Sequence, residues 1–329
     1  MLFLRQSSIV FGFIAATSNV AAWVSQSPVV ANARNALVSS AARTPTVLKM
    51  AEYSAADQVQ RFAAAQAEEN ERFLNIDSVY NGNEIMGKRI LVTGGNRGLG
   101  LEIVKQAVAD GATVIVLCRS SSDELEELVG KWNVYSGVDV VDTDAVNAAL
   151  KRIKSDGGAL DFVINNAGYF YEPCEKIADG SLNFEEQLKQ INICALGPLR
   201  VNAAAVTSKA LADDAKLIII TSQAGSAEWR KIQNKDEGGD YGHHMSRAAC
   251  NIAGVLQAEE LRSKGFAVLM VHPGFNRTEM TSKYKEIWDI EGAVEPSVGA
   301  KRVLYEAMQA SLETTGTFVN AEDGLQIPW

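Results

Sequence analysis

The chain has 329 residues, of which 47% are hydrophobic and 22% are charged, and its formal net charge at pH 7 is −9. This length suffices for one large domain or two small ones with a substantial core, and the acidic balance without a basic stripe argues against a nucleic-acid-binding surface. The four cysteines lie far apart and form no Cys-x-x-Cys pair, which argues against a disulfide framework or a metal site and favours a reducing compartment.

The first 50 residues have the composition of a targeting segment. Leu2–Ala16 is apolar with Arg5 near its start, and is too short for a membrane-spanning helix. Small residues precede Trp23, and the stretch from there to Lys49 lacks acidic residues. This order resembles the bipartite presequence of algae with complex plastids, so we expect a plastid address and no membrane span in the mature protein. A secretory or mitochondrial address is the alternative.

The next segment, residues 51–84, is predicted to contain one amphipathic helix from Ser54 to Leu74. Ser54 can cap this helix, with Asp57 three residues on. Its sparse apolar face consists of Val59, Phe62 and Phe73. We expect the helix to pack on the domain that follows it.

From Lys88 onward, short apolar runs alternate with stretches of helical spacing. The predicted strands are Arg89–Val92, Thr113–Cys118, Leu160–Asn165, Lys216–Thr221 and Phe266–His272. The predicted helices are Leu101–Asp110, Thr143–Lys154, Phe184–Leu211 and Ser246–Lys264. This alternation is typical of an α/β fold, a doubly wound parallel sheet with helices on both faces, and residues 85–329 are expected to form one such domain.

A glycine-rich loop joins the first predicted strand to the first predicted helix. Its sequence is Thr93-Gly94-Gly95-Asn96-Arg97-Gly98-Leu99-Gly100. Glycines permit the tight turn and let a diphosphate approach the backbone, while the helix N-terminus offers free N–H groups and the positive end of the helix dipole. At this junction the pattern predicts a Rossmann-type dinucleotide site.

The spacing Thr-Gly-x-x-x-Gly-x-Gly resembles that of short-chain dehydrogenases/reductases, and the family's pattern can be followed through the whole of residues 85–329. The resemblance implies cofactor contacts from Asp139-Val140 at the adenine, from the strand end Asn165-Asn166-Ala167-Gly168, and from Pro273-Gly274-Phe275-Asn276-Arg277-Thr278 at the nicotinamide. The ending, Gly316–Trp329, resembles the sniffer-type or C-factor-like carbonyl reductases. A homodimer surface on helices 184–211 and 246–264 is also implied by the resemblance.

The choice of cofactor follows from charge. An NAD-specific site places an acidic residue about 20 residues past the loop, where it holds the ribose 2′-hydroxyl. Here Arg119 stands at that place, and Arg97 lies inside the loop. Two guanidinium groups that can face a 2′-phosphate predict NADP(H).

The family's catalytic Tyr-x-x-x-Lys pair is absent. In one register Tyr241 takes the tyrosine place and Met245 the lysine place. In the other, favoured by the Ser-Arg-Ala-Ala-x-Asn sequence from Ser246, His243 takes the tyrosine place and Arg247 the lysine place. The second register keeps a cation one helical turn away.

The resemblance implies that Ser222 holds the substrate oxygen and that Asn192 orders a proton-relay water. With His243 as proton donor and Arg247 on the nicotinamide ribose, the sequence predicts an NADP(H)-dependent oxidoreductase that reduces a small carbonyl compound to an alcohol. Two alternatives stay open, namely Tyr241 as the donor and a non-catalytic nucleotide-binding protein with a regulatory or scaffold role. The sequence carries no recognisable code for the substrate.

Overall fold

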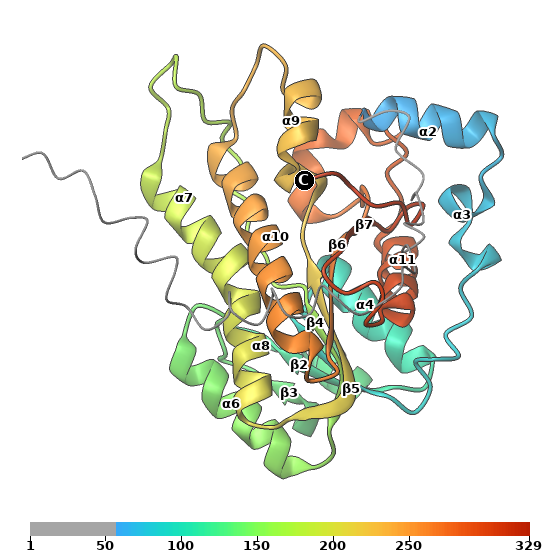
Figure 1. The fold of residues 1–329 in the computed structure, drawn as a ribbon, viewed down its shortest axis with the longest axis vertical. Coiled ribbons are helices and arrows are strands. Elements are labelled where there is room, and N and C mark those ends of the chain that lie inside the picture. The colour runs from blue at the N-terminus through green and yellow to red at the C-terminus, as the bar shows by residue number, and fades with distance from the viewer. Residues whose placement is uncertain (1–56) are drawn as a thin grey trace, which may run out of the picture. The chain divides into compact units, whose positions relative to one another are not determined.

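The computed structural model describes residues 57–329, so the predicted targeting segment 1–50 and its predicted plastid address lie outside the described residues. Within residues 57–329 the strands form one parallel sheet in the order β3-β2-β1-β4-β5-β6-β7 (Figure 1). Their bounds are β1 (Arg89–Thr93), β2 (Thr113–Leu117), β3 (Val134–Tyr135), β4 (Leu160–Asn165), β5 (Leu211–Ile220), β6 (Ala267–His272) and β7 (Phe318–Asn320). The predicted doubly wound α/β fold is confirmed.

The sheet reverses its strand order beside β1. Val92 of β1 pairs with Val116 of β2 on one side and with Ile164 of β4 on the other, both in parallel register. From β1 the chain proceeds outward to β2 and β3, and then from β4 outward to β7 on the opposite side. Ligands of doubly wound sheets bind outside the carboxyl ends of the strands at such a switch point.

Helices cover both faces of the sheet, and each interface is a separate apolar core. The first core contains side chains of α4 (Gly98–Ala109), α5 (Asp123–Val129) and α11 (Pro296–Gln309). The second contains side chains of α6 (Thr143–Asp156), α8 (Gly197–Thr207) and α10 (Tyr241–Arg262), with α7 (Phe184–Ile191) packed on α10. Because the strands are buried on both faces, their sequences are nearly continuous apolar runs.

Several further elements are short. They include η1 (Ile76–Ser78), η2 (Lys131–Asn133), η4 (Gln223–Gly225), α9 (Ala227–Gln233) and η5 (Glu279–Ile287). No helix within residues 57–329 combines the length and the apolar composition that crossing a membrane requires.

The predicted helix Phe184–Leu211 is interrupted and shorter than expected. A π-helical turn, η3 (Asn192–Leu196), separates α7 from α8, and the helical region ends at Thr207. Leu211 instead begins β5 and pairs with Leu160 of β4, so an apolar residue assigned to a helix face belongs to the sheet. Turns of π type are frequent at functional sites, and this one contains Asn192.

The prediction of one helix from Ser54 to Leu74 was wrong, because two helices, α2 (Gln58–Ala67) and α3 (Glu71–Leu74), lie there. Glu69 between them has a left-handed φ of 51°, which ends the first helix. The Asn70 side chain then accepts a hydrogen bond from Phe73 N at 3.1 Å and caps the second helix.

Candidate active site

The glycine-rich loop and the carboxyl end of β4 are joined directly. Gly94 has a left-handed φ of +66°, and a Cβ there would lie 3.0 Å from Ala167 Cα. Thr93 Oγ1 accepts hydrogen bonds from the backbone N–H groups of Asn166 at 3.1 Å and of Ala167 at 3.0 Å. A side chain on Gly100 would collide with the Asn166 amide. The two predicted cofactor motifs are therefore one packed unit at the switch point.

The N-terminus of α4 can hold a diphosphate. Arg97 is its N-cap and makes no capping hydrogen bond with its side chain. Gly98 has a φ of +54°, and a Cβ at this position would meet no atom of the described residues within 4 Å beyond its chain neighbours and its own helix. Free N–H groups, a positive dipole end and an open backbone are what an anionic ligand needs at this place. The residues present thus fit a dinucleotide.

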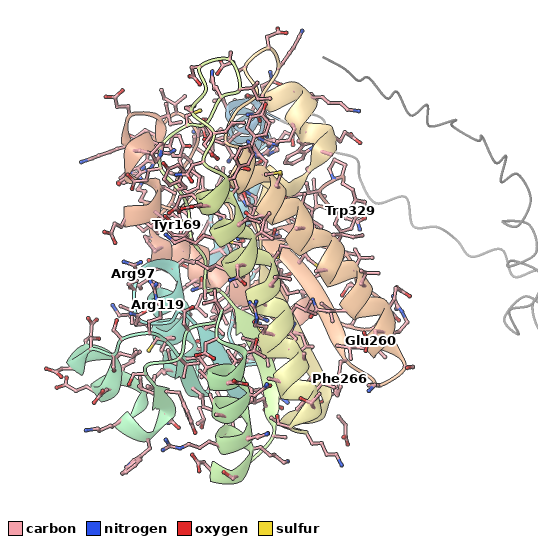
Figure 2. The ribbon with its side chains drawn as sticks, turned by 90° about the vertical axis from the view of Figure 1, so that its left-hand side faces the viewer. Arg97, Arg119, Tyr169, Glu260, Phe266 and Trp329 are labelled. Atoms are coloured by element: carbon pink, nitrogen blue, oxygen red, sulfur yellow. The ribbon has the colours of Figure 1, made fainter. Side chains whose placement is uncertain are left out.

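Two exposed arginines lie beside this helix N-terminus, and Figure 2 shows Arg97 and Arg119 on the same side of the ribbon. Asn96 Nδ2 donates to Ser120 Oγ at 3.4 Å, which links the segments that carry them. Arg97 Nη1 lies 3.5 Å from a Glu279 carboxylate oxygen in a mostly exposed and therefore weak pair. The Arg119 guanidinium makes no ion pair or hydrogen bond with the described part of the chain, so it is available to a phosphate.

At two other predicted cofactor contacts, the turn that carries Asp139 and the turn after β6, a side chain is hydrogen-bonded to the backbone. Asp139 Oδ1 accepts from Val141 N at 3.2 Å, and Val140 is buried beside Gly197 of α8. In the turn after β6, Asn276 Nδ2 donates to Pro273 O and Gly274 O at 3.1 and 3.0 Å. These bonds fix the backbone of a loop that faces the same edge of the sheet.

Asn192 is held by an arginine that the sequence analysis missed. Its Oδ1 accepts from Arg200 Nη2 at 2.6 Å, and its backbone carbonyl accepts from Arg200 Nη1 at 3.2 Å. Arg200 also donates to Val140 O at 3.3 Å. The amide predicted to order a water molecule is therefore fixed in orientation from the next helix.

Ser222 follows β5 and caps η4. Its Oγ accepts from Ala224 N at 3.1 Å, which leaves the hydroxyl proton for an oxygen of a ligand. The short turn lies directly against α10, because a Cβ on Gly225 would be 2.8 Å from the backbone C and O of Arg247. The position of Ser222 thus depends on close packing of η4 on α10.

His243 and Arg247 lie one helical turn apart on α10 and reach the ends of two central strands. Arg247 is 6% exposed. Its Nη1 donates to Ile220 O at 3.3 Å, and its Nη2 lies 3.3 Å from the position of a Cβ on Gly168. The His243 ring meets Phe170 edge to face, with 4.8 Å between centroids. By contrast, Met245 is exposed, which favours the register that pairs His243 with Arg247.

The surroundings of His243 favour its neutral form. Burial lowers the pKa of His243 well below its ordinary value of 6.5, and the nearby Arg247 cation lowers it further. Its Nδ1 is buried and has no partner within residues 57–329. The pKa of His244 is also lowered, by burial and by the Arg230 cation, and its Nδ1 lies 3.1 Å from Ala224 O.

Two segments cover this group of residues. Lys283 of η5 donates to Glu172 O at 2.8 Å and lies 4.2 Å from the centroid of the Phe170 ring. Phe275 meets Tyr284 edge to face at 6.5 Å. The loop after β4 and the turn η5 therefore meet above His243, where the substrate side of the site is expected.

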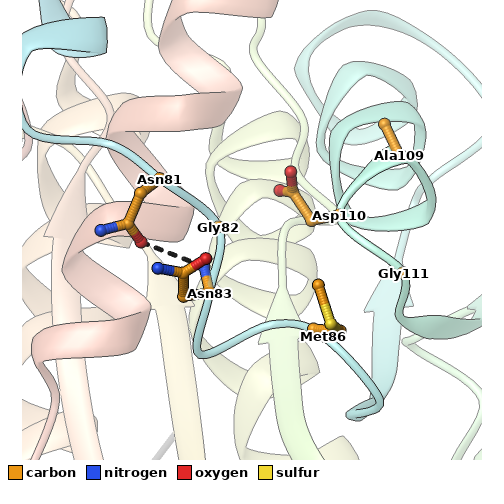
Figure 3. Close-up of a pocket in the computed structure, with 7 residues that line it drawn as sticks. All are labelled: Asn81, Gly82, Asn83, Met86, Ala109, Asp110 and Gly111. Carbon is orange, nitrogen blue, oxygen red and sulfur yellow. Dashed lines mark hydrogen bonds between the residues drawn. The ribbon is translucent and has the colours of Figure 1, made fainter.

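A hollow in another part of the domain lies away from this candidate active site. It has a volume of about 400 Å³ and is lined by Asn81, Gly82, Asn83, Met86, Ala109, Asp110 and Gly111 (Figure 3). These residues precede β1 and β2, so the hollow lies at the amino ends of the strands. None of the predicted catalytic or cofactor residues lines it.

Helices α7 and α10 expose several large apolar side chains. They are Phe184, Leu188, Ile252 and Leu256. The predicted dimer surface lies on these helices, and the homodimer stays a prediction.

Comparison with known proteins agrees with this description. A family model described as short chain dehydrogenase matches residues 88–287. A 1-hydroxy-2-glutathionyl-2-methyl-3-butene dehydrogenase of Rhodococcus sp. (strain AD45) is 30% identical over 240 residues, which cover 73% of this chain and 99% of that protein.

Solved structures show the same fold. The NADPH-bound carbonyl reductase from chicken fatty liver superimposes with a TM-score of 0.62 at 24% identity, covering 74% of this chain and 100% of that one. The carbonyl reductase Sniffer of D. melanogaster gives a TM-score of 0.60 at 22% identity with the same coverage. The predicted resemblance to this family and to its sniffer-type neighbours is confirmed.

Proposed function

Because the chain belongs to the short-chain dehydrogenase family of oxidoreductases, we propose that it is an NADP(H)-dependent enzyme that reduces a carbonyl group to an alcohol. The observation that carries this proposal is the position of Arg247, buried between Gly168 and Ile220 with His243 one turn before it. On this proposal, the Arg247 cation takes the role of the family's lysine and the His243 ring takes the role of its tyrosine.

The preference for NADP(H) rests on charge. Arg119 follows β2 with an unpaired, exposed guanidinium in the described part of the chain, and Arg97 lies beside it in the loop. Solved structures of similar proteins include complexes with NADP and with NAD, so family membership alone does not choose between the two cofactors. Guanidinium groups recognise a phosphate through charge-assisted hydrogen bonds.

The chain's own residues divide the chemistry between them. NADPH, when bound, supplies the hydride. Ser222 donates its hydroxyl proton in a hydrogen bond to the substrate oxygen, because its Oγ already accepts from Ala224 N. His243 gives a proton to that oxygen, and Arg247 donates hydrogen bonds to the ribose but does not give up its own proton. Phe170 and Lys283 cover the group and limit the access of water.

The low pKa of His243 makes reduction depend on the small fraction of imidazolium present near neutral pH. The neutral ring can accept a proton from an alcohol, so the same arrangement suits the reverse oxidation. The lowered pKa of His243 is also the observation that favours the second candidate, a protein that binds the nucleotide without catalysis. Tyr241, at the start of α10, is the alternative donor.

A panel of aldehydes and ketones, with NADPH oxidation followed at the nicotinamide absorbance, tests the proposal. We expect turnover with at least one carbonyl class. Tight NADPH binding without turnover of any carbonyl would contradict the proposed reductase and favour the non-catalytic nucleotide-binding protein.

The address of the protein is a separate proposal from residues 1–50. A fluorescent reporter fused to these residues is expected to reach the plastid of an alga with complex plastids, because a signal-like stretch precedes an acid-free segment. Trp23→Ala is expected to stop the fusion at an earlier membrane. Cytosolic fluorescence of the unaltered fusion would contradict the plastid address.

A further inference from the structure

The helix α2 precedes the segment that the family model matches, yet it lies over the carboxyl side of the sheet (Figure 1). Its buried residues are Gln58, Arg61 and Ala65, so its inner face is largely polar. Buried polar groups are unfavourable unless they make hydrogen bonds. The position of α2 is therefore set by specific polar contacts rather than by an apolar stripe.

One contact of Arg61 outside its own helix is Gln223, the residue after Ser222. Arg61 Nη2 donates to Gln223 Oε1 at 2.8 Å, and its guanidinium lies 4.5 Å from the centroid of the Trp229 ring. Gln233 Nε2 donates to the same Gln223 oxygen at 3.3 Å, from the end of α9. One side chain next to the predicted catalytic serine thus receives hydrogen bonds from two helices.

The opposite side of η4 is fixed by α10. Gly225 leaves no room for a Cβ, which would lie 2.6 Å from Asn251 Nδ2 and 2.8 Å from Arg247 O. The turn that carries Ser222 is therefore held between α10 on one side and α2 with α9 on the other. A shift of α2 would leave Gln223 without one of its donors.

The same helix reaches the substrate side. Gln58 Nε2 donates to Glu291 O at 3.2 Å, and the Phe62 ring fills the space beside Gly292. Glu291 and Gly292 both follow η5, whose Lys283 lies over the Phe170 ring. Helix α2 thus connects the serine turn with the segment that covers the site.

We infer that Arg61 is a positioning residue, which holds Ser222 in its reactive orientation through Gln223. Helix α2, which precedes the segment matched by the family model, then helps to position a residue of the active site. The kinetic part of this inference rests on the proposed function, whereas its structural part does not.

The test compares Arg61→Met, Gln223→Met and the double variant in the full chain. Each single variant is expected to lower kcat by about ten- to a hundredfold, because small misplacements of reacting groups cost this much, with the Kd of NADPH unchanged. The double variant is expected to lose less than the sum of the two single losses, since both single variants remove the hydrogen bond between Arg61 and Gln223. Arg61→Lys, which keeps the charge but not the planar fork, is expected to fall in between.

The matched control is Arg72→Met in the neighbouring helix α3. Arg72 pairs with Glu306 of α11 and stacks on Tyr305, away from Ser222. This variant removes another arginine of the same N-terminal segment and is expected to keep the kcat of the unaltered chain. A role of Arg61 in stability alone would make the two arginine variants alike.

Hydrogen exchange of the backbone amides of residues 222–226 gives a readout that needs no turnover. Faster exchange is expected in Arg61→Met and Gln223→Met, but not in Arg72→Met. If no carbonyl is reduced at all, the proposed function is wrong. Hydrogen exchange alone then tests whether Arg61 positions the turn that carries Ser222. Unchanged exchange in Arg61→Met, or strictly additive kinetic losses in the double variant, would overturn the inference. If Arg61→Met does not fold, Arg61→Lys and Gln223→Met decide by the same criteria.

Discussion

His243→Phe is expected to lower kcat for carbonyl reduction by about 10²–10⁴, the usual contribution of general acid–base catalysis. Phenylalanine keeps the aromatic contact with Phe170, so the substitution removes the proton donor with little change in packing. The Kd of NADPH is expected to stay the same, because the lost interaction belongs to the transition state. Steady-state kinetics and a binding titration on the same preparation measure the two quantities.

A neighbouring aromatic residue provides the control. Tyr241→Phe is expected to be nearly silent. If Tyr241 is the donor, the His243 and Tyr241 variants exchange their behaviour. Carbonyl reduction that is indifferent to both substitutions would contradict the assignment of the proton source. In a chain that only binds the nucleotide, the double change His243→Tyr with Arg247→Lys is expected to create reductase activity.

Arg119→Asp is expected to abolish or reverse the preference for NADPH over NADH. A charge-assisted hydrogen bond to a phosphate is worth about 1.5–3 kcal/mol, which corresponds to a preference of about one to two decades in Kd. An aspartate at this place repels the 2′-phosphate and can accept a hydrogen bond from the 2′-hydroxyl. Fluorescence titration with both cofactors measures the ratio.

Lys154→Asp is the matched control, because it makes the same change of charge on an exposed residue at the far end of α6. It is expected to leave the ratio of the two Kd values unchanged. Equal affinity for NADPH and NADH in the unaltered chain would refute the role of Arg119.

The central strands could be predicted because burial on both faces leaves a direct trace in the sequence. The apolar run Leu160–Asn165 coincides with β4, and the run from Thr113 ends one residue beyond β2. The edge strands β3 and β7 are short, so they give no such run. Helix α11 was missed since its buried face includes Arg302 and Glu306, which obscure the apolar spacing.

Local backbone geometry explains the errors near the N-terminus. The apolar spacing of Val59, Phe62 and Phe73 fits one helix, but it does not encode the left-handed residue Glu69 or the cap at Asn70. Such a break depends on hydrogen bonds and backbone conformation rather than on hydropathy. The start of α10 at Tyr241 is a similar case, because His243 and His244 carry no apolar periodicity.

The candidate site was predictable only where a motif carries its residues. The loop at Gly94, the end of β4 at Gly168 and the pair His243 and Arg247 follow from spacing and topology. Arg200 and Arg61 reach the site from other elements, and no local pattern identifies them. The spacing of His243 and Arg247, one helical turn apart, suffices to predict that the Arg247 cation lowers the pKa of His243. Burial is the larger cause of the lowered pKa, and only the structure shows it.

The pH dependence of NADPH oxidation by the unaltered chain, with a carbonyl that it reduces, shows whether His243 donates the proton. The folded pKa of His243 lies well below 6.5, so the imidazolium fraction decreases about tenfold for each pH unit above it. We expect kcat for reduction to fall in this proportion from neutral pH to about pH 9, while kcat for the reverse oxidation, which uses the neutral ring, stays level. A rate of reduction that stays level up to about pH 9 would contradict His243 as the proton donor.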